Sequence, residues 1–172
     1  MLTNKFKKIM KTTQSSAIVC LFPNVQPINT VETGITQGYY TDHYDFITNK
    51  TVPLQLVKGA KNLYLVCFDG TISETESAEL LRAVGKQPCR NAPQYLLGLM
   101  AEVPENKMPA ELRNKDLVAA EPGDKSSAFT DEGGDRCFLG IYRGVAYRKL
   151  SFVKVGGRWF DSCAFLAENL AP

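Results

Sequence analysis

The sequence has few of the residues from which metal sites and nucleophilic catalytic sites are built. His43 is its one histidine, and its five cysteines include no C-x-x-C pair. The usual zinc patterns and Cys–His catalytic pairs depend on these residue types, so they have few ways to form here. An odd number of separated cysteines is also untypical of a secreted disulfide framework. We therefore predict reduced thiols, a cytoplasmic location, and no metal or other cofactor.

An excess of one charge and a long apolar run are also missing. The chain carries 20 Lys and Arg against 18 Asp and Glu, and its isoelectric point near 8.2 is only mildly basic. A dedicated nucleic-acid binder usually has a higher value and a clustered basic surface. The apolar run at residues 17–22 is too short for a signal peptide or a membrane span. Composition therefore gives no support to nucleic acid as a partner, and we expect no membrane association.

The length of 172 residues fits one domain better than two. Residues 1–16 are polar and basic, without a clear period, and are predicted to form an N-terminal arm. Residues 17–172 are predicted to form a single α+β domain. Within it, residues 104–135 are charged and rich in Pro, Gly, Ser and Asp, which predicts a long loop.

The first half of this domain contains two predicted strands and two predicted helices. The apolar runs at 17–22 and 63–68 indicate buried strands, the second with both faces covered. Ser73 and Glu76 form a capping-box pattern, and the apolar spacing that follows predicts a helix ending at Gly85. A second helix is predicted from Asn91 to about residue 103, with a proline in its first turn.

The C-terminal third predicts an antiparallel meander of three strands, at residues 137–142, 146–155 and 159–166. Gly156-Gly157 is a strong hairpin signal, because glycine accepts the positive φ that tight turns require. The predicted fold is therefore an α+β domain in which an antiparallel sheet, including this meander, packs against about two helices.

Three residues are candidates for catalysis. Cys67-Phe68-Asp69-Gly70-Thr71 resembles the first motif of the haloacid-dehalogenase superfamily of phosphatases, D-x-D-G-T. The resemblance implies a general-acid role for Asp69, but Cys67 replaces the nucleophilic aspartate that the family needs. His43 would have to serve any Cys–His pair. Cys89, which precedes a predicted helix and adjoins Arg90, is the best candidate for a reactive thiol, since both features lower a thiol pKa.

The predicted meander also alternates aromatic and basic residues, a pattern suited to contact with a partner. The candidate binding residues are Tyr142, Arg143, Tyr147, Arg148, Lys149, Arg158 and Trp159. We predict a non-catalytic binding or assembly module that recognises a protein partner or itself. Two alternatives stay open: a small hydrolase or transferase that uses Asp69, His43 or Cys89, and a nucleic-acid-binding module that uses the meander.

Overall fold

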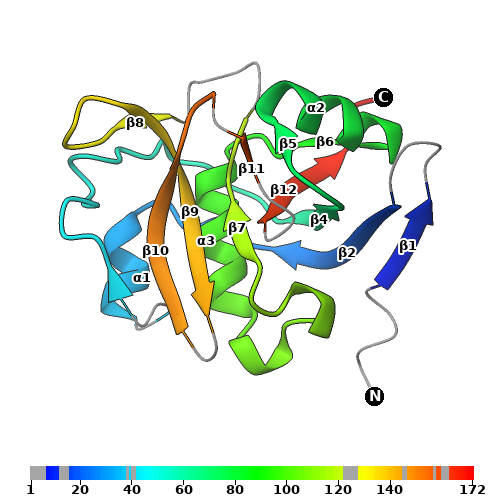
Figure 1. The fold of residues 1–172 in the computed structure, drawn as a ribbon. Coiled ribbons are helices and arrows are strands. Elements are labelled where there is room, and N and C mark those ends of the chain that lie inside the picture. The colour runs from blue at the N-terminus through cyan, green and yellow to red at the C-terminus, as the bar shows by residue number, and fades with distance from the viewer. Residues whose placement is uncertain are drawn as a thin grey trace.

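The computed structural model describes residues 7–11, 16–37, 39, 42–121, 128–144, 147–156, 158–159 and 163–172. These residues form a mixed α and β fold with one large sheet, as the α+β prediction requires (Figure 1). The strands of the large sheet are β1 (Lys7–Lys11), β2 (Ser16–Val25), β3 (Asp42–His43), β4 (Lys61–Phe68), β6 (Lys86–Pro88), β7 (Asp116–Val118), β8 (Phe129–Thr130), β9 (Arg136–Gly144), β10 (Tyr147–Lys154) and β12 (Cys163–Asn169). A small second sheet pairs β5 (Ile72–Ser73) with β11 (Arg158–Trp159).

The large sheet is mixed rather than purely antiparallel, which corrects the prediction. Its main order is β1-β2-β4-β12-β7-β9-β10-β3, with β6 beside β12 and β8 beside β9. β12 runs parallel to β7, and β3 runs parallel to β10, while the other pairs are antiparallel. The parallel pair in the middle arises because the chain returns from β10 and inserts β12 between two strands that formed earlier in the sequence.

The predicted meander is correct for two of its three strands. β9 and β10 pair along their length, from Tyr147 opposite Gly144 to Lys154 opposite Cys137. The third strand does not join β10: β11 pairs with β5, and β12 pairs with β4, β6 and β7. β12 is buried from Cys163 to Glu168, so it needs cover on both faces, which an interior position provides and a sheet edge does not. Gly156 has the predicted left-handed backbone, and Gly157 lies outside the described residues.

One helix covers each face of the sheet. α2 (Glu74–Ala83) has the predicted capping box between Ser73 and Glu76, and its Leu81 packs into a core that contains Val66 and Phe138. α3 (Ala92–Glu102) packs against the opposite face with Leu65 and Leu139. Both predicted helices and both predicted strands of the first half are therefore present, and β4 contributes alternate side chains to the two cores.

α3 is buried along nearly its whole length, from Ala92 to Met100. A helix that is apolar on all sides needs cover opposite the sheet as well. Residues 26–60 provide that cover: the Ile28 N–H donates to the Gln94 carbonyl, and the Tyr95 hydroxyl donates to the Gly59 carbonyl. This segment contains the short helix α1 (Val31–Thr36) as well as β3.

Two segments are more ordered than the sequence predicts. The described part of 104–135 contains the 3-10 turns η2 (Glu105–Lys107) and η3 (Ala110–Leu112) and the strands β7 and β8. Met108, Leu112 and Leu117 are buried there, so this is not simply a surface loop. In the predicted N-terminal arm, β1 pairs with β2 at the sheet edge.

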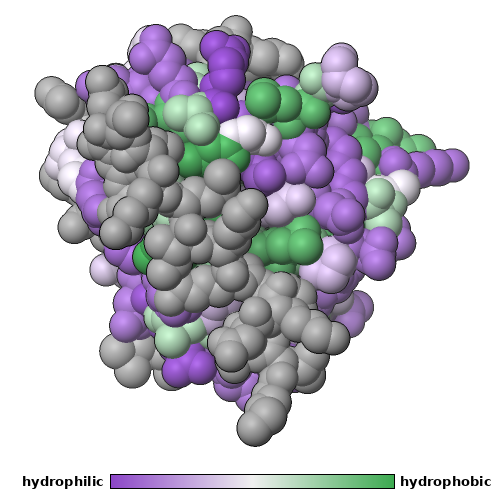
Figure 2. All heavy atoms as spheres, turned by 90° about the vertical axis from the view of Figure 1, so that its right-hand side faces the viewer, coloured by the Kyte–Doolittle hydropathy of each residue, from purple (hydrophilic) through white to green (hydrophobic). Residues whose placement is uncertain are grey.

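The face that includes α2 and the C-terminus is mixed in character. Among its coloured residues, hydrophobic groups are separated by hydrophilic ones, without one continuous apolar area (Figure 2). The features that suggest binding lie elsewhere.

Candidate binding surface and neighbouring sites

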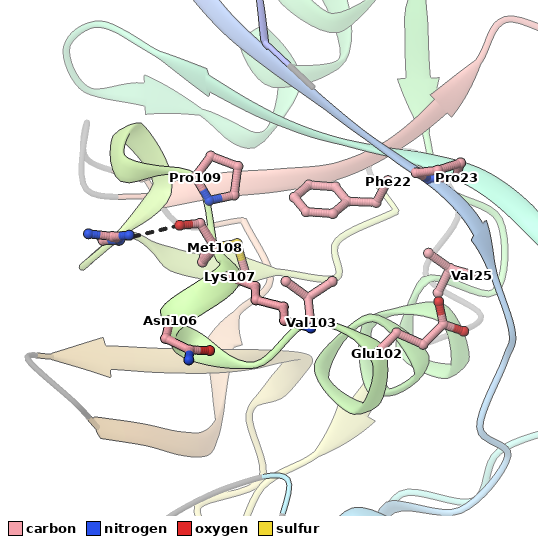
Figure 3. A pocket seen from close by; sticks show the side chains of 10 residues that line it. Phe22, Pro23, Val25, Glu102, Val103, Asn106, Lys107, Met108 and Pro109 are labelled. Atoms are coloured by element: carbon pink, nitrogen blue, oxygen red, sulfur yellow. Dashed lines mark hydrogen bonds between the residues drawn. The ribbon is translucent and has the colours of Figure 1, made fainter. Parts of the chain in front are cut away.

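An apolar pocket lies where β2 meets the two 3-10 turns that follow α3 (Figure 3). Its volume is about 390 Å³. Phe22 points toward Pro109, Met108 and Val103, so segments far apart in the sequence form its walls. β2 is irregular here, because its pairing with β4 shifts between Phe22 and Val25. No feature of the sequence points to this pocket, since its walls meet only in three dimensions.

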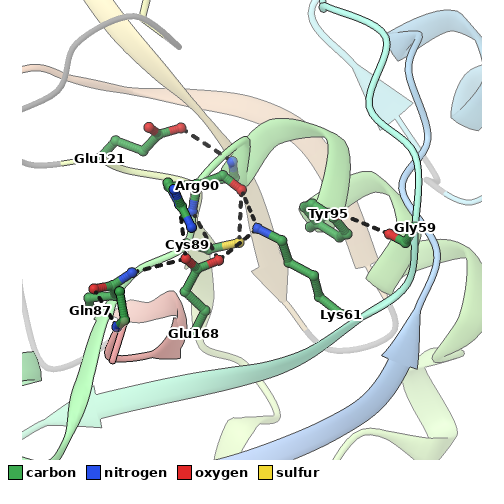
Figure 4. A network of polar contacts seen from close by, with 10 residues as sticks. Gly59, Lys61, Gln87, Cys89, Arg90, Tyr95, Glu121 and Glu168 are labelled. Carbon is green, nitrogen blue, oxygen red and sulfur yellow. Dashed lines mark hydrogen bonds and ion pairs between the residues drawn. The ribbon is translucent and has the colours of Figure 1, made fainter.

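Cys89 lies inside a network of polar contacts between β4, β6, β12 and the start of α3 (Figure 4). The Glu168 carboxylate is the centre of this network. It accepts hydrogen bonds from the Lys61 ammonium at 2.8 Å, the Gln87 amide at 3.0 Å and the Arg90 backbone N–H at 3.3 Å. Burial raises the Glu168 pKa, but the hydrogen bonds from Lys61 and Gln87 outweigh this effect and lower it. The network joins three strands to the helix start.

The environment of Cys89 is the opposite of the one predicted for a reactive thiol. Its side chain is fully buried, and its Sγ is 3.3 Å from the Arg90 carbonyl oxygen. Burial is the main reason that the pKa of the thiol is raised; Lys61 lowers the pKa, and the nearby Glu168 and Glu121 carboxylates raise it. Glu121 also accepts the Ala92 N–H and so caps α3. Burial, together with the two carboxylates, therefore outweighs the nearby cation, and the thiol is held in its unreactive form.

The structure does not bring Asp69 and Cys89 together. Lys61, at the start of β4, donates to the Arg90 carbonyl, whereas Asp69 follows the other end of that strand. The length of β4 separates the two ends by about 25 Å. β3, which carries His43, lies five places from β4 in the sheet order. The three catalytic candidates thus lie on separate parts of the fold.

The environment of Cys67 also departs from the dehalogenase pattern. Its thiol is buried, and burial is the main reason that its pKa rises to about 12. The strand that precedes Asp69 has antiparallel neighbours on both sides, whereas that motif belongs at the end of a parallel strand. Among the described residues, no three or more His, Cys, Asp or Glu side chains gather as a group that could hold a metal ion.

Two of the predicted binding residues, Arg143 and Arg148, are buried rather than exposed. Both guanidinium groups contact the Glu105 carboxylate on η2. Arg143 also donates to the Leu112 carbonyl, and Arg148 to the Val103 carbonyl. Burial raises the Glu105 pKa, but the hydrogen bonds from the two arginines outweigh it and lower it. These arginines hold the turns after α3 against β9 and β10.

Tyr142 and Lys149 lie on neighbouring strands at the surface. They are directly opposite each other on β9 and β10, so their side chains share a face. Tyr142 is 53% exposed. The Lys149 ammonium lies 3.9 Å from the centre of the Tyr44 ring and 3.4 Å from an Asp42 carboxylate oxygen. We call Tyr44, Tyr142, Lys149 and Asp42 the β10-edge surface.

Tyr44 and Asp42 were not found by sequence reasoning. They lie about a hundred residues before β10 in the chain, in a stretch without a regular period. The sequence signal that could have indicated them is the group Asp42-His43-Tyr44. Asp42 and His43 form β3, which pairs in parallel with β10. Tyr44 is 39% exposed, and its ring also contacts Phe46 and Phe152.

For three other predicted binding residues, the structure describes the backbone alone. The backbone of Tyr147 belongs to β10, and the backbones of Arg158 and Trp159 form β11. Their side chains lie outside the described part of the structure.

In the part of the chain that the structure describes, no helix has both the length and the apolar character needed to cross a bilayer. Comparison with known proteins finds no matching family model, no significantly similar curated protein and no significantly similar solved structure.

Proposed function

We propose that the chain is a non-catalytic binding module that recognises a protein partner through the β10-edge surface. One observation carries the proposal: Tyr142 is half exposed directly opposite Lys149, whose ammonium lies over the Tyr44 ring. Tyrosine offers a large, stiff and amphipathic contact at low entropic cost, which is why it is enriched in interface hot spots. Packing of Tyr44 on Phe46 and Phe152 supports a surface that is ordered before binding.

The burial of Arg143 and Arg148 favours a protein over a nucleic acid. Nucleic-acid binding draws much of its affinity from exposed cations that neutralise phosphates. Two of the four cations among the candidate binding residues, Arg143 and Arg148, are instead paired with Glu105. At the β10-edge surface itself, Lys149 is accompanied by the Asp42 carboxylate. A mixed surface of aromatic and oppositely charged groups suits a protein contact better.

The test for a partner compares three baits in a lysate of the source cells. The wild-type chain, a Tyr142→Ser variant and a Leu56→Ser control are each immobilised, and the retained proteins are quantified by mass spectrometry. Leu56 is 74% exposed and does not belong to the β10-edge surface. We expect a protein that the wild type and the Leu56 variant retain equally. The Tyr142 variant should bind this protein about tenfold more weakly, which corresponds to a loss of about 1.4 kcal/mol. A retained set that ignores Tyr142→Ser would contradict the proposal.

Self-recognition is tested separately by sedimentation velocity over a range of protein concentrations. If the partner is a second copy, the wild type has a mass above 19.0 kDa, and Tyr142→Ser returns it to the monomer. A monomeric wild type leaves a different protein as the partner. An oligomer that persists in the variant would place the interface elsewhere.

A further inference from the structure

The apolar pocket between β2 and the 3-10 turns has a buried floor. Val25 and Met108 are each 1% exposed and Phe22 is 6% exposed, and Val103 and Pro109 complete the apolar lining. A pocket of about 390 Å³ lies within the range of small-molecule sites, which are mostly apolar with a few polar groups that fix orientation. The buried floor suits an apolar group. The exposed lining residues Lys107 and Arg113 suit a polar group.

The polar groups of this pocket are unequal in charge. Lys107 and Arg113 lie on its lining together with Glu102 and Asn106. Neither cation forms an ion pair with any residue that the structure describes. The Arg113 Nε donates to the Met108 carbonyl, which ties the guanidinium to the backbone of a residue that lines the pocket. The Glu102 carboxylate accepts the Gln26 N–H through Oε1, so the lining carries two cations against one carboxylate.

We propose that this pocket binds a free amphipathic anion, a carboxylic acid with a medium-length acyl chain. The acyl chain lies on Phe22, Val25 and Met108, and the carboxylate meets Arg113 and Lys107 at the mouth. Because a water-sized group occupies about 30 Å³, the pocket holds about thirteen non-hydrogen atoms, which is more than a single apolar protein side chain. This matches a saturated acid such as decanoate.

The site is independent of the β10-edge surface, since the two share no residue. Binding of a small acid and binding of a protein are therefore separate proposals, and either can fail without the other.

Guanidinium and ammonium groups are suited to a carboxylate because their hydrogen bonds are charge-assisted.

The experiment titrates the full chain with decanoate, decanol and decylamine below their aggregation concentrations, using isothermal titration calorimetry. We expect decanoate to bind with one-to-one stoichiometry and about tenfold more tightly than decanol, the usual gain from a hydrogen bond to a charged group. Decylamine should bind most weakly, because Lys107 and Arg113 repel it.

Variants assign the site. Arg113→Gln and Lys107→Gln should each reduce decanoate affinity about threefold to tenfold and leave decanol unchanged. Arg82→Gln is the matched control, because Arg82 is an exposed cation on α2. Val103→Phe, which fills the pocket, should abolish binding of both decanoate and decanol. Far-ultraviolet circular dichroism and thermal melting identify any variant that fails to fold.

Three results would overturn the proposal. Equal affinity for the acid and the alcohol would remove the role of the two cations. Decanoate binding that survives Val103→Phe in a folded protein would place the ligand elsewhere. No binding of decanoate by the wild type would show that the pocket is not a site for an acid of this class.

Discussion

Gly98 shows how one missing side chain can permit a fold. The backbone of residue 26 passes so close to α3 that a Cβ at Gly98 would lie 1.8 Å from the Gln26 carbonyl oxygen. That contact accompanies two hydrogen bonds between the same segments, from the Gln26 N–H to Glu102 and from the Ile28 N–H to Gln94. Glycine at this position lets residues 26–30 cover the helix.

Gly98→Ala should therefore destabilise the protein by about 3 kcal/mol, at the upper end of the cost of overpacking, because rigid backbone atoms block the added methyl group. The measurement is urea unfolding followed by circular dichroism. Gly133→Ala is the control, since a Cβ there meets only ordinary contact at 3.4 Å, and its effect should stay within about 0.5 kcal/mol. Similar unfolding midpoints for the two variants would refute the steric argument.

Glu105 should make stability depend on pH. Its pKa in the folded protein lies below the ordinary value of 4.5 because of Arg143 and Arg148. Its stabilising contribution is therefore complete above about pH 4.5 and is lost as the pH falls through the lower, folded pKa. Glu105→Gln should cost about 2–3 kcal/mol at neutral pH, since it leaves two buried guanidinium groups without a counter-charge.

The check is a series of urea titrations of both proteins from neutral pH to about pH 3. The difference in unfolding free energy between wild type and Glu105→Gln should shrink toward acid pH. Asp116 acts in the opposite direction, because burial raises its pKa, but it is common to both proteins and cancels in the difference. A gap that stays constant with pH would mean that the Glu105 charge does not matter.

At the scale of elements, sequence patterns predicted those helices and strands that are determined by interactions between neighbouring residues. The capping box, the apolar periods and the alternation of β9 with β10 could be identified from neighbouring residues, and these elements are where the sequence predicts them. The partners of β12 could not be identified in this way. They are strands far apart from it in the sequence, and the apolar pattern of β12 does not indicate which strands it pairs with. The burial of Arg143 and Arg148 was missed for the same reason: Glu105 is distant in sequence from both.

The capping box of α2 offers a test at this scale. Ser73→Ala removes the side chain that accepts the Glu76 N–H and should cost about 1 kcal/mol. Thr75→Ala, at an exposed position in the same first turn, should change stability by less than about 0.5 kcal/mol. Thermal unfolding of both variants gives the comparison, and equal losses would show that the cap contributes no more than surface packing.

At the scale of the whole molecule, the cysteine thiols show how well the two hydrophobic cores are shielded from solvent. All five cysteines are buried, and the pKa values of Cys67 and Cys137 rise to about 12 and about 11, mainly by burial. Thiolate, rather than thiol, is the reactive form.

The folded chain should therefore react very slowly with an aromatic disulfide reagent near neutral pH, whereas all five thiols react at once in guanidinium chloride. The release of thiolate is followed by absorbance. A single fast-reacting equivalent in the native protein would reveal a site opened by motion, and mass spectrometry of the labelled peptides would show whether it is Cys89.

The position of β12 has a consequence for how the protein is assembled. In the described structure, β12 joins the group β1-β2-β4 to the group β7-β9-β10-β3, and every strand that it joins precedes it in the chain. On a ribosome, both half-sheets emerge before the strand that unites them. Until it arrives, each half exposes an apolar edge of the kind that promotes aggregation. Folding of this chain is thus completed late, by the closure of contacts between distant residues, and it should be slow for its size.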